Sequence, residues 1–146
     1  MQLLSSIKKK YLIYSALAII ISLSVYLGFK YSIYNQDYHH SFFILSMYID
    51  SLNGFNYFKD IFLQYGPGQL IFLNYIDAFF KINIVSLLKI HVIIYAINLI
   101  ILFKIFEKIS TSKNAIILIF IIFLIHPYSV YPWPDYLSGI SLSLFF

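Results

Sequence analysis

The chain has 146 residues, of which 61% are hydrophobic, 21% aromatic and only 11% charged. A soluble domain carries about 25% charged residues, so this composition and a mean hydropathy of +0.83 exclude an ordinary soluble fold and indicate an integral membrane protein. The net charge of +4 comes from lysines spread between apolar stretches, which bears on topology and not on nucleic-acid binding, and the lack of cysteine excludes disulfides and thiolate chemistry.

The first predicted element is a membrane span at residues 11–29. This stretch carries no charge and meets the requirement of about 20 residues for a hydrocarbon core about 30 Å thick. Lysines at residues 8–10 precede it and place the N-terminus in the cytoplasm by the positive-inside rule. The stretch exceeds the roughly 7–15 apolar residues of a signal peptide, and "YLGFKYS" offers no small-residue cleavage site, so we interpret it as a retained anchor.

A long external loop is predicted from residue 30 to residue 83, with two helices lying in the membrane interface. The first covers residues 38–53 and stops at Gly54. The second covers residues 68–82, which are too short to cross the membrane and which combine a polar face with an apolar one.

The faces of these two helices follow from their helical spacing. On the first helix the expected apolar stripe consists of Tyr38, Phe42, Leu45, Ile49 and Leu52. On the second helix the expected polar face consists of Asn74, Asp77 and Lys81. An Asp77–Lys81 pair, four residues apart, is expected to support that helix by a few tenths of a kcal/mol.

The second predicted span covers residues 84–106. Inside it His91, Tyr95 and Asn98 fall on one side of a helix, and such a polar stripe is expected to face protein or a water-filled cavity, not lipid. Hydrogen bonding between helices without chemistry is the favoured reading of these three residues. The lysines that follow place residues 107–114 in the cytoplasm.

A third span at residues 109–126 and a fourth at 137–146 complete the prediction. The uncharged part of the third is short, so residues 126–136 are expected to sit below the outer surface and line a cavity. They belong to a second external loop, 127–136. The fourth span stops after ten residues, which suggests the N-terminal part of a longer protein whose C-terminal helices are its missing partners.

The predicted fold class is therefore an all-α integral membrane protein with three transmembrane helices, the start of a fourth and two interfacial juxtamembrane helices. Its composition, free of arginine and rich in isoleucine, phenylalanine and lysine, suggests AT-rich coding DNA and a bacterial inner (plasma) membrane. Five of the six acidic residues fall on the predicted outer side, and their one-sidedness suggests a site there: Asp37, Asp50, Asp60, Asp77 and Asp135.

The first external loop carries a set of motifs in a fixed order. It reads "NQDYHHSFFILSMYIDSLNGFNYFKDIFLQYGPGQ", with Asp37, a helix ending in Gly54, the run 57–60 and Tyr-Gly-Pro at 65–67. This order resembles the first loop of GT-C fold glycosyltransferases, the superfamily of protein mannosyltransferases and aminoarabinose transferases. Those enzymes often carry Asp-Glu at the first position, whereas Tyr38 follows Asp37 here.

The resemblance implies transfer of a sugar from a polyprenyl-phosphate donor to an acceptor outside the membrane, with Asp37 as the catalytic carboxylate. As a partly buried base, Asp37 could deprotonate the acceptor. The predicted substrate-binding residues, several of them cations for the leaving phosphate, are His39, His40, Lys59, Asp60, Tyr65 and Lys89. A divalent metal held by Asp37 and Asp135 could serve the same phosphate. The expected partners are the lipid-linked sugar donor and membrane lipids.

Other interpretations stay open. Asp37 is suited to cap the helix that starts at Tyr38, and Lys59 and Asp60 could be solvated loop charges. The whole chain could be a non-enzymatic membrane protein, such as a transporter or an assembly subunit, or an inactive truncated gene product.

Overall fold

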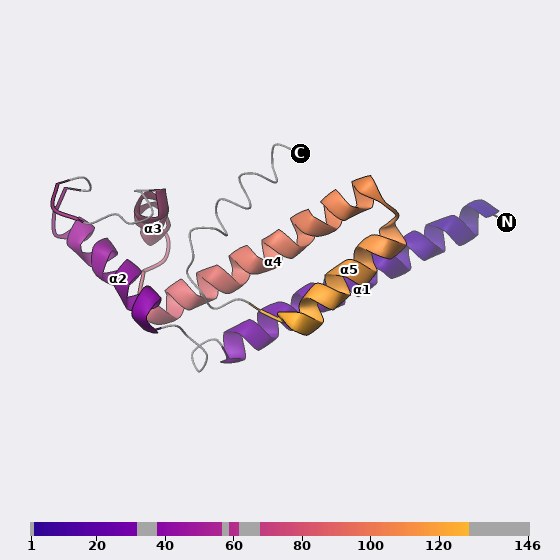
Figure 1. Cartoon of the computed structure of the whole chain (residues 1–146), viewed down its shortest axis with the longest axis horizontal. Coiled ribbons are helices and arrows are strands. Elements are labelled where there is room, and N and C mark those ends of the chain that lie inside the picture. Colours follow the sequence, from indigo (N-terminus) through magenta and orange to yellow (C-terminus); the bar gives the residue numbers. More distant parts are fainter. Residues whose placement is uncertain (1, 32–37, 57–58, 62–67, 129–146) are drawn as a thin grey trace.

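The computed structural model describes residues 2–31, 38–56, 59–61 and 68–128. These residues are all-helical and contain no strand. Five helices follow one another in the order α1 Gln2–Tyr31, α2 Tyr38–Leu52, α3 Gly68–Asp77, α4 Ile84–Ile109 and α5 Ser112–Ile125. Figure 1 shows α1, α4 and α5 side by side, with α2 and α3 at the end of α4 where that helix begins.

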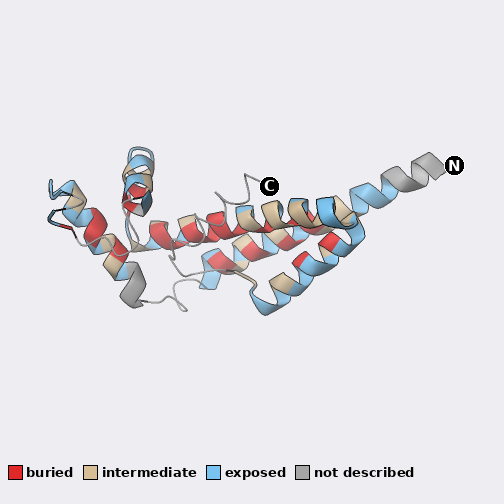
Figure 2. Ribbon diagram, turned by 45° about the horizontal axis from the view of Figure 1, so that its top comes forward, coloured by how far each residue is buried: buried red, intermediate tan, exposed pale blue. Residues whose placement is uncertain are grey.

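The three-helix bundle of α1, α4 and α5 has an apolar core. Its buried residues come from all three helices: Leu17, Ile20, Phe103, Ala115 and Ile119. Figure 2 shows buried positions running along α4, which contacts each of the other helices of the bundle, while α5 is mostly exposed or half-buried.

Among the residues that the structure describes, two helices are long and apolar enough to cross a membrane, Lys8–Tyr31 and Ile84–Ile109. They contain the predicted spans 11–29 and 84–106. The third predicted span, 109–126, is shorter than expected. The chain turns at Ser110, Thr111 caps α5 by accepting a hydrogen bond from the backbone N–H of Asn114, and the helix has 14 residues. That is about 21 Å of helix, less than the roughly 30 Å of a hydrocarbon core.

Helices α1 and α4 approach closely at Gly28. A Cβ added there would lie 2.5 and 2.6 Å from the two methyl carbons of Val92. Ser24, one turn earlier on α1, is fully buried. Small residues four apart let two helix backbones meet closely within a membrane, and Ser24 and Gly28 provide that surface.

Helices α2 and α3 pack on each other and on the first turns of α4 around a second core. Its buried residues include Ile44 and Tyr48 of α2, Leu70 and Leu73 of α3, and Leu87 of α4. Helices α2 and α3 thus form a folded helical pair between α1 and α4, which we call the α2–α3 unit.

The apolar stripe predicted for residues 38–53 is not the face that α3 covers. Phe42 is 52% exposed and Ile49 47% exposed, whereas Ile44 and Tyr48 are each 2% exposed. Helix α2 carries apolar side chains on two faces, and the face that packs against α3 is the one that is buried. Leu52, also in the predicted stripe, is exposed.

Helix α3 ends earlier than the predicted 68–82. It stops at Asp77, whose side chain accepts a hydrogen bond of 2.8 Å from the backbone N–H of Ile82. The chain therefore turns before Lys81, and the predicted helical Asp77–Lys81 spacing does not form. Asn74, predicted on a polar outer face, instead hydrogen-bonds Ser51 of α2, with 3.2 Å between its Nδ2 and the Ser51 Oγ.

Helix α4 begins where predicted because its start is capped. The Asn83 side chain accepts hydrogen bonds from the backbone N–H groups of Val85 and Ser86, each 3.0 Å long. The Ser86 hydroxyl in turn accepts from the backbone N–H of Asn83 at 2.8 Å. This reciprocal capping box satisfies amide groups that a helix start otherwise leaves unpaired.

Candidate functional site

The structure describes only some of the predicted site residues. Asp37, Tyr65 and Asp135 lie outside the described residues, as does the predicted span 137–146. His39 and His40 are in the first turn of α2. The roles predicted for these residues stay predictions.

Lys59 and Asp60 lie in the turn that follows α2, and both are exposed. The Asp60 carboxylate accepts a hydrogen bond of 3.0 Å from the backbone N–H of Asn56 and one of 3.4 Å from its side-chain amide. The next residue, Ile61, is buried in the core of the α2–α3 unit. Asp60 therefore closes a local turn, a structural role that stands beside the predicted substrate-binding one.

Lys89 is exposed on the second turn of α4, and its ammonium lies 5.8 Å from the centre of the Phe29 ring on α1. At the same end of α1, the Lys30 ammonium lies 5.1 Å from the Tyr31 ring. Two lysines from different helices thus lie at the end of the bundle where α1 ends and α4 begins. The sequence predicts Lys89 as a substrate-binding residue, and Lys30 only as the first residue of the external loop.

One carboxylate of the α2–α3 unit is fixed in place. Asp77 accepts hydrogen bonds from the backbone N–H of Ile82 and from the hydroxyl of Tyr48. These two donors hold the pKa of Asp77 below its usual value, and nearby Lys81 adds to the effect. Burial, with a smaller effect of the Asp77 charge, raises the pKa of Tyr48 to about 12.

A polar cluster marks the place where α5 ends. The buried Tyr95 donates a hydrogen bond to the backbone carbonyl of His126, and Ser24 donates one of 2.6 Å to the carbonyl of Pro127. The buried His91 pairs through Nδ1 with the carbonyl of Leu87 at 2.7 Å. Two residues of the predicted polar stripe of α4, His91 and Tyr95, therefore face protein as expected, and the third, Asn98, is half-buried.

This cluster lies part-way along the bundle. Ser24 is about two turns, or some 10 Å, short of the end of α1. The backbone thus leaves the helical conformation beside α1 and α4 at the depth of the predicted spans, and its carbonyls are satisfied by side chains. Residues 126–128 lie beside α1 and α4, and residues 129–136 lie outside the described chain. That residues 126–136 sit below the outer surface of the membrane stays a prediction.

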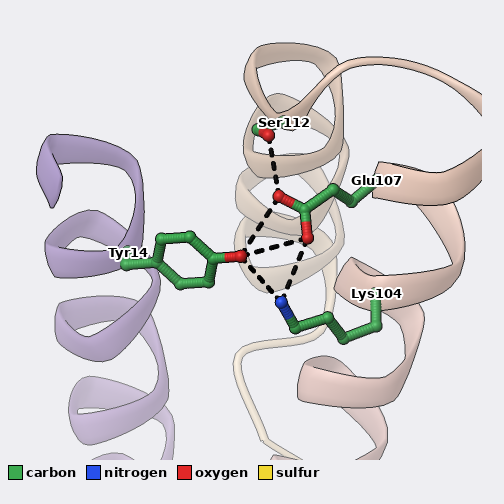
Figure 3. Close-up of polar contacts among 4 residues, drawn as sticks. All are labelled: Tyr14, Lys104, Glu107 and Ser112. Carbon is green, nitrogen blue, oxygen red and sulfur yellow. Dashed lines mark hydrogen bonds and ion pairs between the residues drawn. The ribbon is translucent and has the colours of Figure 1, made fainter. Parts of the chain in front are cut away.

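The sixth acidic residue, Glu107, lies at the opposite end of the bundle. Its carboxylate accepts hydrogen bonds from Tyr14 of α1 at 3.1 and 3.2 Å and from Ser112 of α5 at 2.7 Å. It also pairs with Lys104 at 3.0 Å. Figure 3 shows the four side chains meeting between the three helices. Only the Lys104–Glu107 pair, three residues apart on one helix, could be predicted locally, because Tyr14 and Glu107 are 93 positions apart in the sequence.

No three histidine, cysteine or acidic side chains come together as a metal site among the residues that the structure describes. The metal predicted on Asp37 and Asp135 lies outside that part and stays a prediction. No protein-family model, no curated protein and no solved structure matches the chain.

Proposed function

We propose that the chain forms part of a membrane glycosyltransferase that takes a sugar from a polyprenyl-phosphate donor on the outer side of the membrane. The observation that carries the proposal is the α2–α3 unit, a helical pair between two candidate spans that folds around a core shared with the start of α4. A loop that only connects two spans needs no such core, whereas a loop that positions a substrate does.

Two details support the comparison with the GT-C loop. Helix α2 ends just before Gly54, which adopts a φ of +85°, the left-handed conformation that ends helices. The expected order of a helix and a terminal glycine is therefore present. Lys30 and Lys89 stand at the same end and provide positive charge for a phosphate.

In this proposal Asp37, the residue that precedes α2 in the sequence, is the base that deprotonates the acceptor. The carrier phosphate leaves as the sugar–oxygen bond to the acceptor forms, and Lys30 and Lys89 offset its charge. The exposed apolar side chains of α2 lie against the isoprenoid chain and neighbouring lipids.

The test uses membranes containing the protein, supplied with radiolabelled undecaprenyl-phosphate mannose. Asp37→Asn keeps the ability to cap a helix but removes the base, and the loss of a general base costs about 100-fold or more in rate. The matched control is Asp50→Asn, which neutralises an exposed aspartate on α2. We expect sugar transfer to be lost only with Asp37→Asn. If Asp37→Asn retains half of the wild-type rate of sugar transfer, Asp37 is not the base.

A non-enzymatic membrane subunit is the second candidate, and the polar stripe of α4 favours it. His91 and Tyr95 are buried and hydrogen-bonded within the chain, so helix packing alone explains them. This candidate predicts no labelled sugar transfer in any variant. It also predicts no photo-crosslinking of the protein to undecaprenyl phosphate, whereas the first candidate predicts crosslinking that Lys30→Gln and Lys89→Gln weaken.

A further inference from the structure

The end of the bundle farthest from the α2–α3 unit contains a cleft of about 480 Å³. It lies between the N-terminal part of α1 and the turn that joins α4 to α5. Its lining residues are Lys9, Lys10, Ile13, Glu107, Thr111, Ser112 and Lys113. Two lysines at the start of the first candidate span and a lysine that follows the second thus meet at one site, although about a hundred residues separate them.

The residues that line this cleft carry more positive than negative charge. Glu107 is its single carboxylate, and that group is already occupied by Tyr14, Lys104 and Ser112. Among the described residues, no carboxylate lies within ion-pair distance of Lys9 or Lys113. The cleft therefore presents lysine ammonium groups that no acidic group of the described chain neutralises.

The position of the cleft limits what it can meet. The first candidate span begins at Lys8, and α5 begins at Ser112. Lys9 and Lys10 therefore lie at the start of the first candidate span and Lys113 in the first turn of α5, where a membrane-spanning arrangement would bring them near phospholipid headgroups. Basic pockets between helices on the cytoplasmic side bind phosphate headgroups of anionic lipids, and the lysine distribution predicts that this side is cytoplasmic.

We propose that this cleft binds a phosphate group, supplied by an anionic phospholipid or by a soluble phosphate compound. Lys9 and Lys113 approach the phosphate from α1 and α5, and Lys10 adds charge from the wall. The Glu107 cluster holds the three helices together so that the lysines stay on either side of the cleft. The site lies at the opposite end of the bundle from the α2–α3 unit and does not depend on the proposed sugar transfer.

The experiment uses the purified protein in nanodiscs of phosphatidylcholine doped with photoreactive phosphatidylglycerol or, in parallel, photoreactive phosphatidylcholine. Crosslinks are located by mass spectrometry of the digested protein. Each lysine near a membrane surface contributes roughly fivefold to the binding of anionic lipid. Lys9→Gln with Lys113→Gln should therefore lower phosphatidylglycerol crosslinking by at least about tenfold.

The matched control is Lys8→Gln with Lys108→Gln, which removes the same charge from lysines that do not line the cleft. This pair removes the same general surface charge, so we expect it to lower overall lipid binding but to leave crosslinking at the cleft residues several-fold higher than the Lys9 and Lys113 pair does. Lys9→Arg with Lys113→Arg keeps the charge and should keep the crosslinking. Circular dichroism checks that all variants are equally helical.

A second arm identifies the source of the phosphate. Competition by millimolar inorganic phosphate, with loss of the crosslink near residues 111–113, would support a site for soluble phosphate compounds. Crosslinking that resists inorganic phosphate would support the lipid headgroup. The proposal is overturned if both double glutamine variants lose crosslinking equally, or if phosphatidylcholine crosslinks at these residues as strongly as phosphatidylglycerol while inorganic phosphate has no effect.

Discussion

The close contact between α1 and α4 makes Gly28→Ala the most informative single substitution for the bundle. The added Cβ would lie 2.5 and 2.6 Å from the two Val92 methyl carbons and 3.1 Å from its Cβ. Carbon atoms in van der Waals contact are about 3.5–4.0 Å apart, so the helices would have to separate by about 1 Å. Val92 cannot turn away, because it is fully buried and a β-branched side chain has one preferred rotamer in a helix.

Forcing an extra carbon into a packed core costs about 1–3 kcal/mol, and we expect Gly28→Ala to lower the free energy of unfolding by that amount. The assay is loss of helical circular dichroism in mixed micelles as the fraction of denaturing detergent rises. Gly68→Ala is the matched control, since no atom lies within 4 Å of the added Cβ at that position. It should leave the unfolding midpoint unchanged.

A double-mutant cycle tests the cause. Val92→Ala removes the two methyl groups that the new Cβ would meet, at its own cost of about 2 kcal/mol. Combined with Gly28→Ala it should cost less than the sum of the two changes by about 1 kcal/mol or more. The rescue is expected to be partial, because the Val92 Cβ remains 3.1 Å from the added carbon. Strict additivity, or a Gly28→Ala protein as stable as the wild type, would refute the close contact.

Three further predictions concern the α2–α3 unit and are read from hydrogen exchange of its backbone amides. Gly54→Ala should destabilise the unit by about 1 kcal/mol because φ is +85° there, while Gly68→Ala, which lacks that strain, should not; equal effects would contradict the left-handed cap. The pKa of Asp77 is lowered in the folded protein. Its contribution to stability is therefore present above the unfolded pKa of about 3.9 and is lost as pH falls through the folded pKa. Asp77→Asn should remove this loss of stability at acid pH. Tyr48 has a folded pKa of about 12 against 10.0 unfolded, so its contribution to stability should be lost as pH rises between these values. Tyr48→Phe should abolish this loss of stability at alkaline pH. If the pH dependence of stability is the same in Tyr48→Phe and wild type, the hydroxyl of Tyr48 is not buried.

The parts of the fold that the sequence could predict depend on local signals. Residues 84–109 begin after Asn83, whose side chain and that of Ser86 form the caps that start a helix. The uncharged stretch 11–29 is long enough to require a helix in an apolar environment. Gly54 marked the end of α2 because only glycine adopts its conformation readily.

What could not be predicted depends on which elements meet. Helix α2 carries apolar side chains on two faces, and nothing local distinguishes Phe42 from Ile44; the position of α3 decides. Helix α3 ends at Asp77, where the carboxylate accepts hydrogen bonds from the backbone N–H of Ile82 and from the hydroxyl of Tyr48. Tyr48 belongs to another helix, so this end of α3 depends on a tertiary contact. The pair Ser24 and Gly28 did carry a usable signal, since small residues four apart favour close helix packing.

The candidate site likewise has a part that local sequence predicts and a part that depends on how the helices pack. The motif order around Asp37 could be read from the sequence, since it consists of neighbouring residues. The lysines at the same end come from two helices far apart in the chain, and only Lys89 was identified. The Glu107 cluster and the cleft beside it required the packing of three helices, so no spacing along the sequence predicted them.

The hydrogen bonds at the end of α5 have a consequence for how the protein is assembled during synthesis. The carbonyls of His126 and Pro127 are paired with Tyr95 of α4 and Ser24 of α1, and an unpaired carbonyl in hydrocarbon costs several kcal/mol. In the membrane arrangement that we propose, a nascent α5 can therefore reach its final position only after α1 and α4 have come together. The order of translation matches that requirement, because α1 and α4 both leave the ribosome before α5. Helix α5 can then pack against an α1–α4 pair that has already formed.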